Sequence, residues 1–215
     1  NLGLLHERQK NSEKAVAAYG KAVDLEPDYF LGWYALARAL ENRKDYDGAI
    51  EAYEHCVELD YANAGLHGQL GLLYHLQKRP LDARTEFRRA LGYAPGDAVA
   101  LYTLGLIAVE EKNWPEAIDH FEQLVKKRPD FTEALLHLGY LYNQAEDLKG
   151  AVEALRRASR AAPNMPDVWY YLGIAQSARG EFKGAESSFR RCASLNPKAP
   201  EPRFQLGVIL DRQGR

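Results

Sequence analysis

The residue types that could carry out chemistry are scattered along this sequence of 215 residues, and their spacing matches no catalytic or metal-binding motif. The six histidines form no H-E-x-x-H segment and no local cluster, which a zinc site would need. Two acidic pairs, Glu110-Glu111 and Glu146-Asp147, fall at expected turns between helices, where they are solvated and do not form an acid/base pair. The sequence also lacks G-x-x-x-x-G-K-[ST] and G-x-S-x-G, which hold phosphates or a nucleophilic serine. We therefore expect no catalytic residue, no metal and no cofactor, and hence no enzyme in these residues.

Composition and charge place the chain among soluble, folded proteins. Hydrophobic residues make up 46% and charged residues 27% of the sequence, enough apolar content to bury a core. The formal net charge is −2, which excludes capture of DNA or RNA by a bulk positive field, so we expect no nucleic-acid partner. No stretch reaches the roughly 18 apolar residues that span a bilayer, and no signal peptide is visible. We expect no direct membrane insertion and a cytoplasmic location.

A period of 34 residues runs through the whole sequence and predicts the elements that must position any functional side chain. Alanine recurs with this spacing at Ala15, Ala49, Ala83, Ala117, Ala151 and Ala185. Position 1 of a repeat is counted at residues 30, 64, 98, 132, 166 and 200. The prediction is one array over residues 1–215, made of a partial repeat 1–29, the full repeats 30–63, 64–97, 98–131, 132–165 and 166–199, and a partial repeat 200–215. Repeats of this length are typical of stacked architectures.

Each repeat predicts two helices joined by a short turn. In the first half, apolar residues such as Trp33, Leu36 and Leu40 recur at helical spacing. The second half begins at a polar residue that can cap a helix, and a proline at position 32, replaced by Tyr61 in one repeat, ends it because proline lacks an N–H. The predicted caps of second helices are Asn11, Asp45, Asn113 and Asp147, and those of first helices are Asp28, Asp97 and Asp130.

Small and large residues occupy fixed positions in the two helices. Position 8 holds glycine in six repeats and alanine in one, although a glycine inside a helix costs roughly 0.5–1 kcal/mol relative to alanine. We infer that the helices approach closely there, and that large side chains at position 24 fill the contact: Tyr19, Tyr53, Phe87, Phe121, Leu155 and Phe189. Cys56 and Cys192 share position 27 with alanines and predict small core residues that are too far apart to pair. Because one helix pair cannot bury both of its faces, the repeats must stack into an α-solenoid.

The first and second helices also carry the signatures of a known family. First-helix segments are Trp33-x-x-Leu36-Ala37, Trp169-x-x-Leu172-Gly173, Leu70-Gly71-x-x-Tyr74 and Leu138-Gly139-x-x-Tyr142, and second-helix segments are Ala83-x-x-x-Phe87, Ala117-x-x-x-Phe121 and Ala185-x-x-x-Phe189. Over the whole chain these segments resemble the tetratricopeptide repeat (TPR), although His67 and Arg203 stand where tryptophan is common. The resemblance implies an all-α fold, an α-solenoid of 34-residue helix-turn-helix repeats forming a right-handed superhelix, with first helices along a concave groove and second helices on the convex back. It also implies a role in protein–protein interaction.

One face of the first helices stays apolar after the core positions are taken away. Positions 5 and 9 and their neighbours should be polar if they met only water. We predict that they line a partner-binding groove, whose residues are Tyr34, Arg38, Gly68, Leu72, Tyr102, Leu106, Val109, Leu136, Tyr140, Tyr170, Ile174 and Phe204. Exposed apolar surface of this extent usually marks an interface. The alternative is that these side chains only pad the inner wall of the solenoid against one another.

Two details of this face refine the prediction. Gly68 falls between Tyr34 and Tyr102 in one row, so a notch between two rings could take a partner's side chain; the alternative is a glycine tolerated by drift. TPR chaperone adaptors that hold a C-terminal carboxylate use lysine, arginine and asparagine along this groove. Here Arg38 stands almost alone among Tyr, Leu, Ile and Val, which argues against a carboxylate clamp.

Charge on the second helices suggests another surface. Residues 149–215 hold twelve basic and six acidic residues. We predict a secondary basic patch for an acidic protein, made of Arg156, Arg157, Arg190 and Arg191 at positions 25 and 26 of the repeats. The alternative is a solvated face with i,i+4 pairs between Glu153 and Arg157 and between Glu186 and Arg190. The period of 34 residues, the near-neutral pI of about 6.4 and the apolar groove argue against RNA.

The favoured function is a scaffold or adaptor that binds a hydrophobic or amphipathic peptide or helix of a partner protein in its concave groove and helps to assemble a complex. The alternative is the substrate- or partner-targeting TPR arm of a larger enzyme such as a glycosyltransferase, and a third hypothesis is a structural array. Since Asn1 begins inside a first helix and Arg215 precedes a second helix, we expect these residues to be part of a longer chain. Uncapped ends could also lead to end-to-end self-association.

Overall fold

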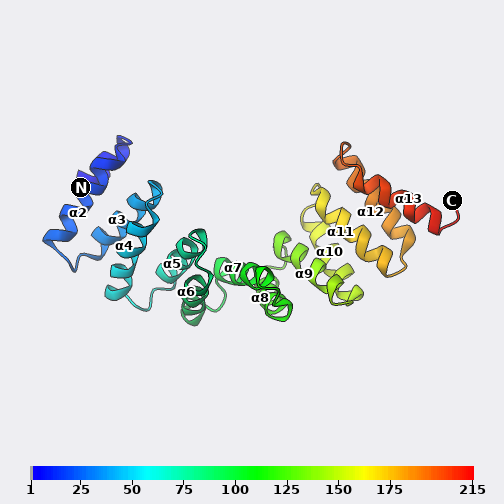
Figure 1. Ribbon diagram of the computed structural model, residues 1–215, viewed down its shortest axis with the longest axis horizontal. Helices are drawn as coiled ribbons and strands as arrows, with labels where there is room; N and C mark the ends of the chain where they lie inside the picture. The colour runs from blue at the N-terminus through cyan, green and yellow to red at the C-terminus, as the bar shows by residue number, and fades with distance from the viewer. Residues whose placement is uncertain (1) are drawn as a thin grey trace. The chain divides into compact units, whose positions relative to one another are not determined.

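The computed structural model describes residues 2–215, and over that range it contains thirteen α-helices and no strand. Asn1, predicted to lie inside a first helix, is outside the described residues. First helices begin at position 1 in every full repeat, 34 residues apart, as the period predicts. The helices (Figure 1) are α1 Leu2–Arg8, α2 Ser12–Leu25, α3 Phe30–Asn42, α4 Tyr46–Leu59, α5 Ala64–Leu76, α6 Pro80–Tyr93, α7 Ala98–Glu110, α8 Trp114–Lys127, α9 Thr132–Gln144, α10 Leu148–Ala161, α11 Pro166–Ala178, α12 Phe182–Leu195 and α13 Glu201–Arg212.

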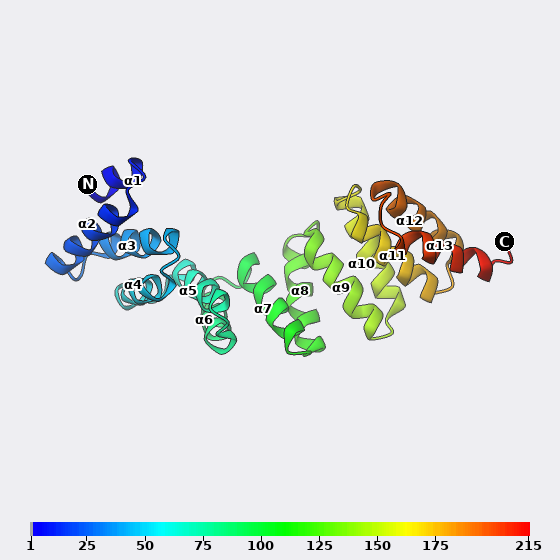
Figure 2. The same cartoon turned by 45° about the horizontal axis from the view of Figure 1, so that its top comes forward.

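The described residues form two compact units, one ending at Ala100 and the other beginning at Leu101. In the first unit each helix from α1 to α6 contacts the next one along the chain. In the second unit α8 to α13 do the same, and the first helices α9 and α11 also contact each other. Within each unit, therefore, neighbours in the sequence are neighbours in space (Figure 2). The prediction of a single array over the whole chain stays a prediction.

The polar residues predicted to start the second helices do so through their side chains. Asp147 accepts a hydrogen bond from the Gly150 main-chain N–H at 2.9 Å, which satisfies one of the donors left open at a helix start. The same bond is made by Asn11, Asp45 and Asn113.

The caps predicted for the first helices are only partly correct. Asp97 accepts from the main-chain N–H of Ala100 at 2.7 Å, as expected. Asp28 and Asp130 do not cap, because α3 and α9 begin one residue later than a cap at these aspartates requires. Their N-cap residues are Tyr29 and Phe131, which make no side-chain cap bond.

The close approach predicted at position 8 is present. A methyl group on Gly173 would lie 2.7 Å from Cε1 of Phe189, whose side chain is fully buried. A methyl group on Gly105 would lie 2.6 Å from Cε1 of Phe121. Real Cβ atoms do not approach carbon this closely, so α11 and α12 can pack at this spacing only because position 8 lacks a side chain. At Gly207, in α13, a methyl group would meet no atom within 4 Å.

The turns between first and second helices contain a feature that the sequence did not reveal. Position 15 adopts a left-handed conformation, with φ of 63° at Lys44 and 59° at Lys112. Gly180 takes the same role without a Cβ, at φ 79°. A non-glycine residue in this region costs roughly 1–2 kcal/mol. The turns therefore bear local strain that the packing of the two helices stabilises.

Both cysteines are buried, unpaired residues, which confirms their predicted place in the core. Burial raises the pKa of the Cys56 thiol to about 12, because the thiolate would lose its hydration. No helix among residues 2–215 has both the length and the apolar character needed to cross a bilayer.

Candidate interaction surfaces

In the first unit, two predicted groove residues line a hollow of about 480 Å³ between α1, α2 and α3. Tyr34 and Arg38 contribute to its wall from α3, and Leu4 contributes from α1. The Arg38 side chain is exposed and Tyr34 is half-buried, so both are accessible to a partner. Ala15 and Ala39 are buried small residues that line the same hollow and leave room in it.

The chemistry of this hollow is amphipathic. Its apolar wall is lined by alanines and by the ring of Tyr19, while Glu7, Lys10 and Arg38 bring charges of both signs. Burial raises the pKa of Tyr19 to about 12, and the nearby Glu7 carboxylate adds to the shift. The phenol therefore stays a neutral hydrogen-bonding group at physiological pH.

A second hollow of about 290 Å³ in the same unit shares Tyr34 and Arg38 with the first. It also contains Glu41, Tyr53 and Gln69, and is mainly polar. The Tyr53 hydroxyl donates to the Glu41 carboxylate at 3.2 Å, so both groups are held in place. Arg38 therefore stands between an amphipathic hollow and a polar one.

The remaining predicted residues of the first unit, Gly68 and Leu72, are half-buried on α5. A methyl group on Gly68 would meet nothing within 4 Å, so the space beside this glycine is open. The notch predicted from the sequence stays a prediction, since its other wall would involve the second unit.

In the second unit, most predicted groove residues are half-buried. Two are clearly exposed, Tyr140 at 41% and Phe204 at 70% of their surface. The half-buried ones are Tyr102, Leu106, Val109, Leu136, Tyr170 and Ile174. Both alternatives that the sequence left open therefore remain, because six of these side chains are half-buried while Tyr140 and Phe204 are exposed.

Ring contacts explain why these tyrosines are half-buried. Tyr102 lies 5.9 Å from Phe121 and 5.4 Å from Phe131, measured between ring centroids. Tyr170 lies 6.0 Å from Phe189 in an edge-to-face arrangement. Position 5 thus packs on the large residue at position 24, a contact worth about 0.5–1.5 kcal/mol beyond its buried area.

His137 belongs to the same layer of rings. It stacks on Phe121 with centroids 5.0 Å apart and an interplanar angle of 6°. Burial lowers the pKa of His137, because the charged ring would be poorly solvated there. Among residues 2–215, no group of His, Cys, Asp and Glu side chains is arranged to hold a metal ion.

Exposed apolar side chains are not confined to the predicted groove. Leu25 is 83% and Leu81 is 74% exposed, and both lie on second helices. These two residues are single exposed side chains of the kind that folded proteins tolerate. The groove is therefore distinguished by the hollow at Tyr34 and Arg38 rather than by exposure alone.

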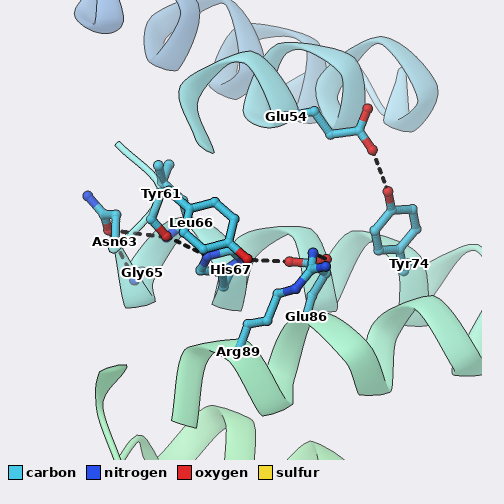
Figure 3. A network of polar contacts seen from close by, with 9 residues as sticks. All are labelled: Glu54, Tyr61, Asn63, Gly65, Leu66, His67, Tyr74, Glu86 and Arg89. Atoms are coloured by element: carbon cyan, nitrogen blue, oxygen red, sulfur yellow. Dashed lines mark hydrogen bonds and ion pairs between the residues drawn. The ribbon is translucent and has the colours of Figure 1, made fainter. Parts of the chain in front are cut away.

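His67 shows how the repeat accommodates a residue that replaces tryptophan (Figure 3). At position 4, Trp33 and Trp169 donate through Nε1 to the carbonyls of Pro27 and Pro163, at 2.7 and 2.9 Å. His67 makes the equivalent bond, since its Nε2 lies 2.9 Å from the Tyr61 carbonyl oxygen. These bonds join each first helix to the loop that follows the preceding second helix.

The other nitrogen of His67 is bound as well. Its Nδ1 lies 2.7 Å from Oε2 of Glu86, whose other oxygen accepts from Arg89 at 2.6 Å (Figure 3). The His67 side chain is completely buried, and its ring stacks on that of Tyr93. Because both nitrogens have partners, His67 is a structural residue rather than a ligand-binding one.

The four arginines of the predicted basic patch have partners inside the chain. Arg190 pairs with Glu186 at 2.6 Å, one of the two i,i+4 pairs considered from the sequence. Arg156 reaches forward to Glu181 in the next repeat at 2.8 Å. Part of this charge therefore stabilises the fold.

Arg157 and Arg191 act at the joints between repeats. They donate to the carbonyls of Pro129 and Pro163 at 3.1 and 3.3 Å. Position 4 holds Leu135 in one of these repeats, which offers no donor to Pro129, and Arg157 supplies it. Arg157 thus binds a main-chain carbonyl of the previous repeat rather than serving only as the partner of a neighbouring glutamate.

A family model described as "Tetratricopeptide repeat" matches residues 1–60, 102–166 and 144–200. Among solved structures, a TPR protein, YrrB, described as having an unusual peptide-binding site, superposes with a TM-score of 0.73 at 18% identity, over 94% of this chain and 100% of that one. This likeness confirms the predicted fold class, an all-α solenoid of helix-turn-helix repeats.

Two curated relatives are similar over about half of this chain. The cytochrome c-type biogenesis protein CycH of Pseudomonas aeruginosa is 29% identical over 114 residues, which are 52% of this chain and 28% of CycH. The human protein O-mannosyl-transferase TMTC3 is 29% identical over 118 residues, 53% of this chain and 13% of TMTC3. The matched segment is thus a small part of each relative.

Proposed function

This chain belongs to the tetratricopeptide repeat family, and we propose that it is a protein-interaction scaffold whose first helices bind an amphipathic segment of a partner. The general role in protein–protein interaction follows from the repeat fold, which presents long surfaces and carries no catalytic motif in this sequence. Binding in the groove and a part in complex assembly are the proposal. The cytoplasmic location and end-to-end self-association stay predictions from the sequence.

The observation that carries the proposal is the hollow of about 480 Å³ at Tyr34 and Arg38. Pockets of a few hundred Å³ with apolar walls and a few polar groups are typical ligand sites. An apolar side chain of the partner can occupy this hollow beside Leu4 and Tyr34, while Arg38 can pair with a carboxylate next to it. We therefore expect a partner segment with an apolar residue and an acidic residue next to each other.

The test is selection of peptides that bind this chain from a displayed random library, followed by affinity measurements on variants. The variant Leu4→Asp/Arg38→Glu changes two exposed residues of the hollow. The matched control Leu25→Asp/Lys21→Glu makes the same chemical changes on the exposed face of α2. We expect the first variant to weaken the selected peptide at least about ten-fold, or roughly 1.4 kcal/mol, and the control to leave it unchanged. Equal loss in both variants would reject the groove.

A second candidate function is supported by the similarity to TMTC3, which is named as a protein O-mannosyl-transferase. In that case the chain is the partner-recognition arm of a longer enzyme, and the chemistry lies outside these 215 residues. The sequence of the complete gene distinguishes the two, because a glycosyltransferase domain joined to the array is expected only for the second.

A further inference from the structure

We propose that the second unit carries a separate docking site on α10 that binds an acidic segment of a partner protein. The site, which we call the basic hollow, has a volume of about 500 Å³. Its cations are Lys149, Arg156, Arg157 and Arg160 from α10 and Arg179 from the end of α11. It shares no residue with the predicted groove, so it does not depend on the proposed function.

The basic hollow is built from one face of a second helix. Lys149, Arg156 and Arg160 are seven and four residues apart, which puts them on the same side of α10. Since a helix rises 1.5 Å per residue, these three side chains extend over about 16 Å. Val152 also lies among the lining residues, but its side chain is fully buried, so the accessible wall is formed by the charged side chains.

Three of the cations are held in place by the fold. Glu181 accepts from Arg156 at 2.8 Å through one oxygen and pairs with Arg179 at 3.1 Å through the other. Arg157 is fixed by its bond to the Pro129 carbonyl. Guanidinium groups that are already fixed lose little freedom when an anion binds, which favours recognition.

Two further cations are available for a partner. Lys149 and Arg160 are exposed, and neither side chain has a hydrogen bond or an ion pair in the part of the chain that the structure describes. They lie at the two ends of the row formed by Lys149, Arg156 and Arg160 on α10. A partner that bridges them therefore binds along the helix rather than at one point.

The balance of charge selects an anionic partner. The hollow is lined by five cations and one carboxylate, that of Glu153, while Glu181 pairs with Arg156 and Arg179 and Glu122 lies with Arg157 in an adjoining hollow. A concave site with charge of one sign concentrates ions of the other sign and speeds their association. The positive excess is therefore expected to attract acidic groups even though the whole chain has a net charge of −2.

The shape of the hollow favours an acidic peptide over other anions. An extended chain advances about 3.3 Å per residue, so the distance of about 16 Å along α10 from Lys149 to Arg160 matches about five residues. A single phosphate group could reach only part of it. The residues that line the hollow include no aromatic ring, whereas single-stranded nucleic acids bind largely by stacking on such rings.

Fluorescence anisotropy with a labelled peptide of alternating aspartate and glutamate, measured at low salt, tests the proposal. Charge reversal with Lys149→Glu/Arg160→Glu is compared with Lys127→Glu/Lys198→Glu, which changes the net charge equally at two exposed lysines outside the hollow. We expect the first variant to weaken the acidic peptide at least about ten-fold and the control to change it less than about two-fold. The same peptide with asparagine and glutamine should not bind.

The remaining outcomes are also informative. An equal loss in both variants would overturn the proposal, because only the overall charge would then matter. Tighter binding of a uridine hexamer than of the acidic peptide would overturn it in favour of RNA. If charge reversal lowers the helical circular dichroism signal, Lys149→Gln/Arg160→Gln replaces it. A peptide selected for the groove should bind Lys149→Glu/Arg160→Glu normally, which separates failure of this proposal from failure of the proposed function.

Discussion

The close packing at position 8 yields a prediction with a built-in control. Gly173 and Gly207 occupy the same repeat position in the second unit, on α11 and α13. A methyl group at Gly173 would lie 2.7, 2.8 and 2.9 Å from three carbons of the Phe189 ring. At Gly207 it would meet no atom within 4 Å. Replacement of glycine by alanine therefore adds a methyl group to a crowded contact at Gly173 and to open space at Gly207.

The magnitude follows from two opposing terms. Replacing a helical glycine by alanine stabilises a helix by about 0.5–1 kcal/mol, and both variants gain this term. Overpacking a filled core costs typically about 1–3 kcal/mol, and only Gly173→Ala bears this cost, because the fully buried Phe189 has no space to move into. We expect Gly207→Ala to raise the free energy of unfolding and Gly173→Ala to lower it. The difference between the two variants, about 1–3 kcal/mol, measures the overpacking term alone.

The assay is urea unfolding followed by helical circular dichroism, with the fluorescence of Trp33, Trp114 and Trp169 as a second probe. Coincident transitions by the two probes are needed before free energies are compared, because repeat arrays can unfold in parts. If Gly173→Ala is as stable as Gly207→Ala, the argument from close helix approach is wrong.

Three further predictions concern buried polar groups. Burial lowers the pKa of His137 below its ordinary 6.5, so the unfolded chain takes up a proton before the folded chain does. The free energy of unfolding therefore falls as the pH drops through about 6.5. The difference between the urea midpoints at about pH 7.5 and pH 5 should be smaller in His137→Gln than in the unmodified chain. Burial raises the pKa values of the Cys56 and Cys192 thiols, so few thiolates form in the folded chain at about pH 8. Iodoacetamide at this pH should therefore label neither thiol in the folded chain and both thiols in urea. Rapid labelling of the folded chain would contradict the buried placement of the two cysteines. His67→Leu removes the partner of the Tyr61 carbonyl and of one oxygen of Glu86, whose other oxygen keeps Arg89, and should cost about 1–3 kcal/mol by urea unfolding. An unchanged midpoint would show that water replaces the ring.

The helices could be predicted from the sequence because their signals are local and repeated. Asp147 lies three residues before Gly150 and marks the start of α10 by spacing alone. The contact of Gly173 with Phe189 follows from residue size at two fixed positions. Neither inference needs the relative placement of distant residues.

Signals that depend on a neighbouring repeat could not be read in this way. Asp130 has the right residue type for a cap, but α9 starts at Thr132, and the aspartate lies too early. Arg157 has a glutamate four residues before it, yet it donates to Pro129, which lies 28 residues away. A long side chain has many possible partners, and only the packed repeats decide among them.

The sequence predicts which residues lie on the groove face, a prediction that stays open, but it does not predict how exposed each of them is. The sequence places Tyr102 and Tyr140 on the same helix face, while the structure shows the first half-buried on Phe121 and the second exposed. The difference comes from the ring layers beneath them, which no single position encodes. The hollow at Arg38 likewise depends on small residues of two helices, α2 and α3.

Hydroxyl-radical footprinting with a peptide selected for binding tests most directly whether a partner lies against the first helices. The side chains compared are exposed to similar degrees on the two kinds of surface: Leu4, Tyr140 and Phe204 on first helices, and Leu25, Tyr61 and Tyr93 on second helices or the loops after them. Bound peptide should reduce oxidation at one or more of the first three and leave the last three unchanged. Protection of Leu25, Tyr61 or Tyr93, with Leu4, Tyr140 and Phe204 oxidised as in the free chain, would contradict the groove.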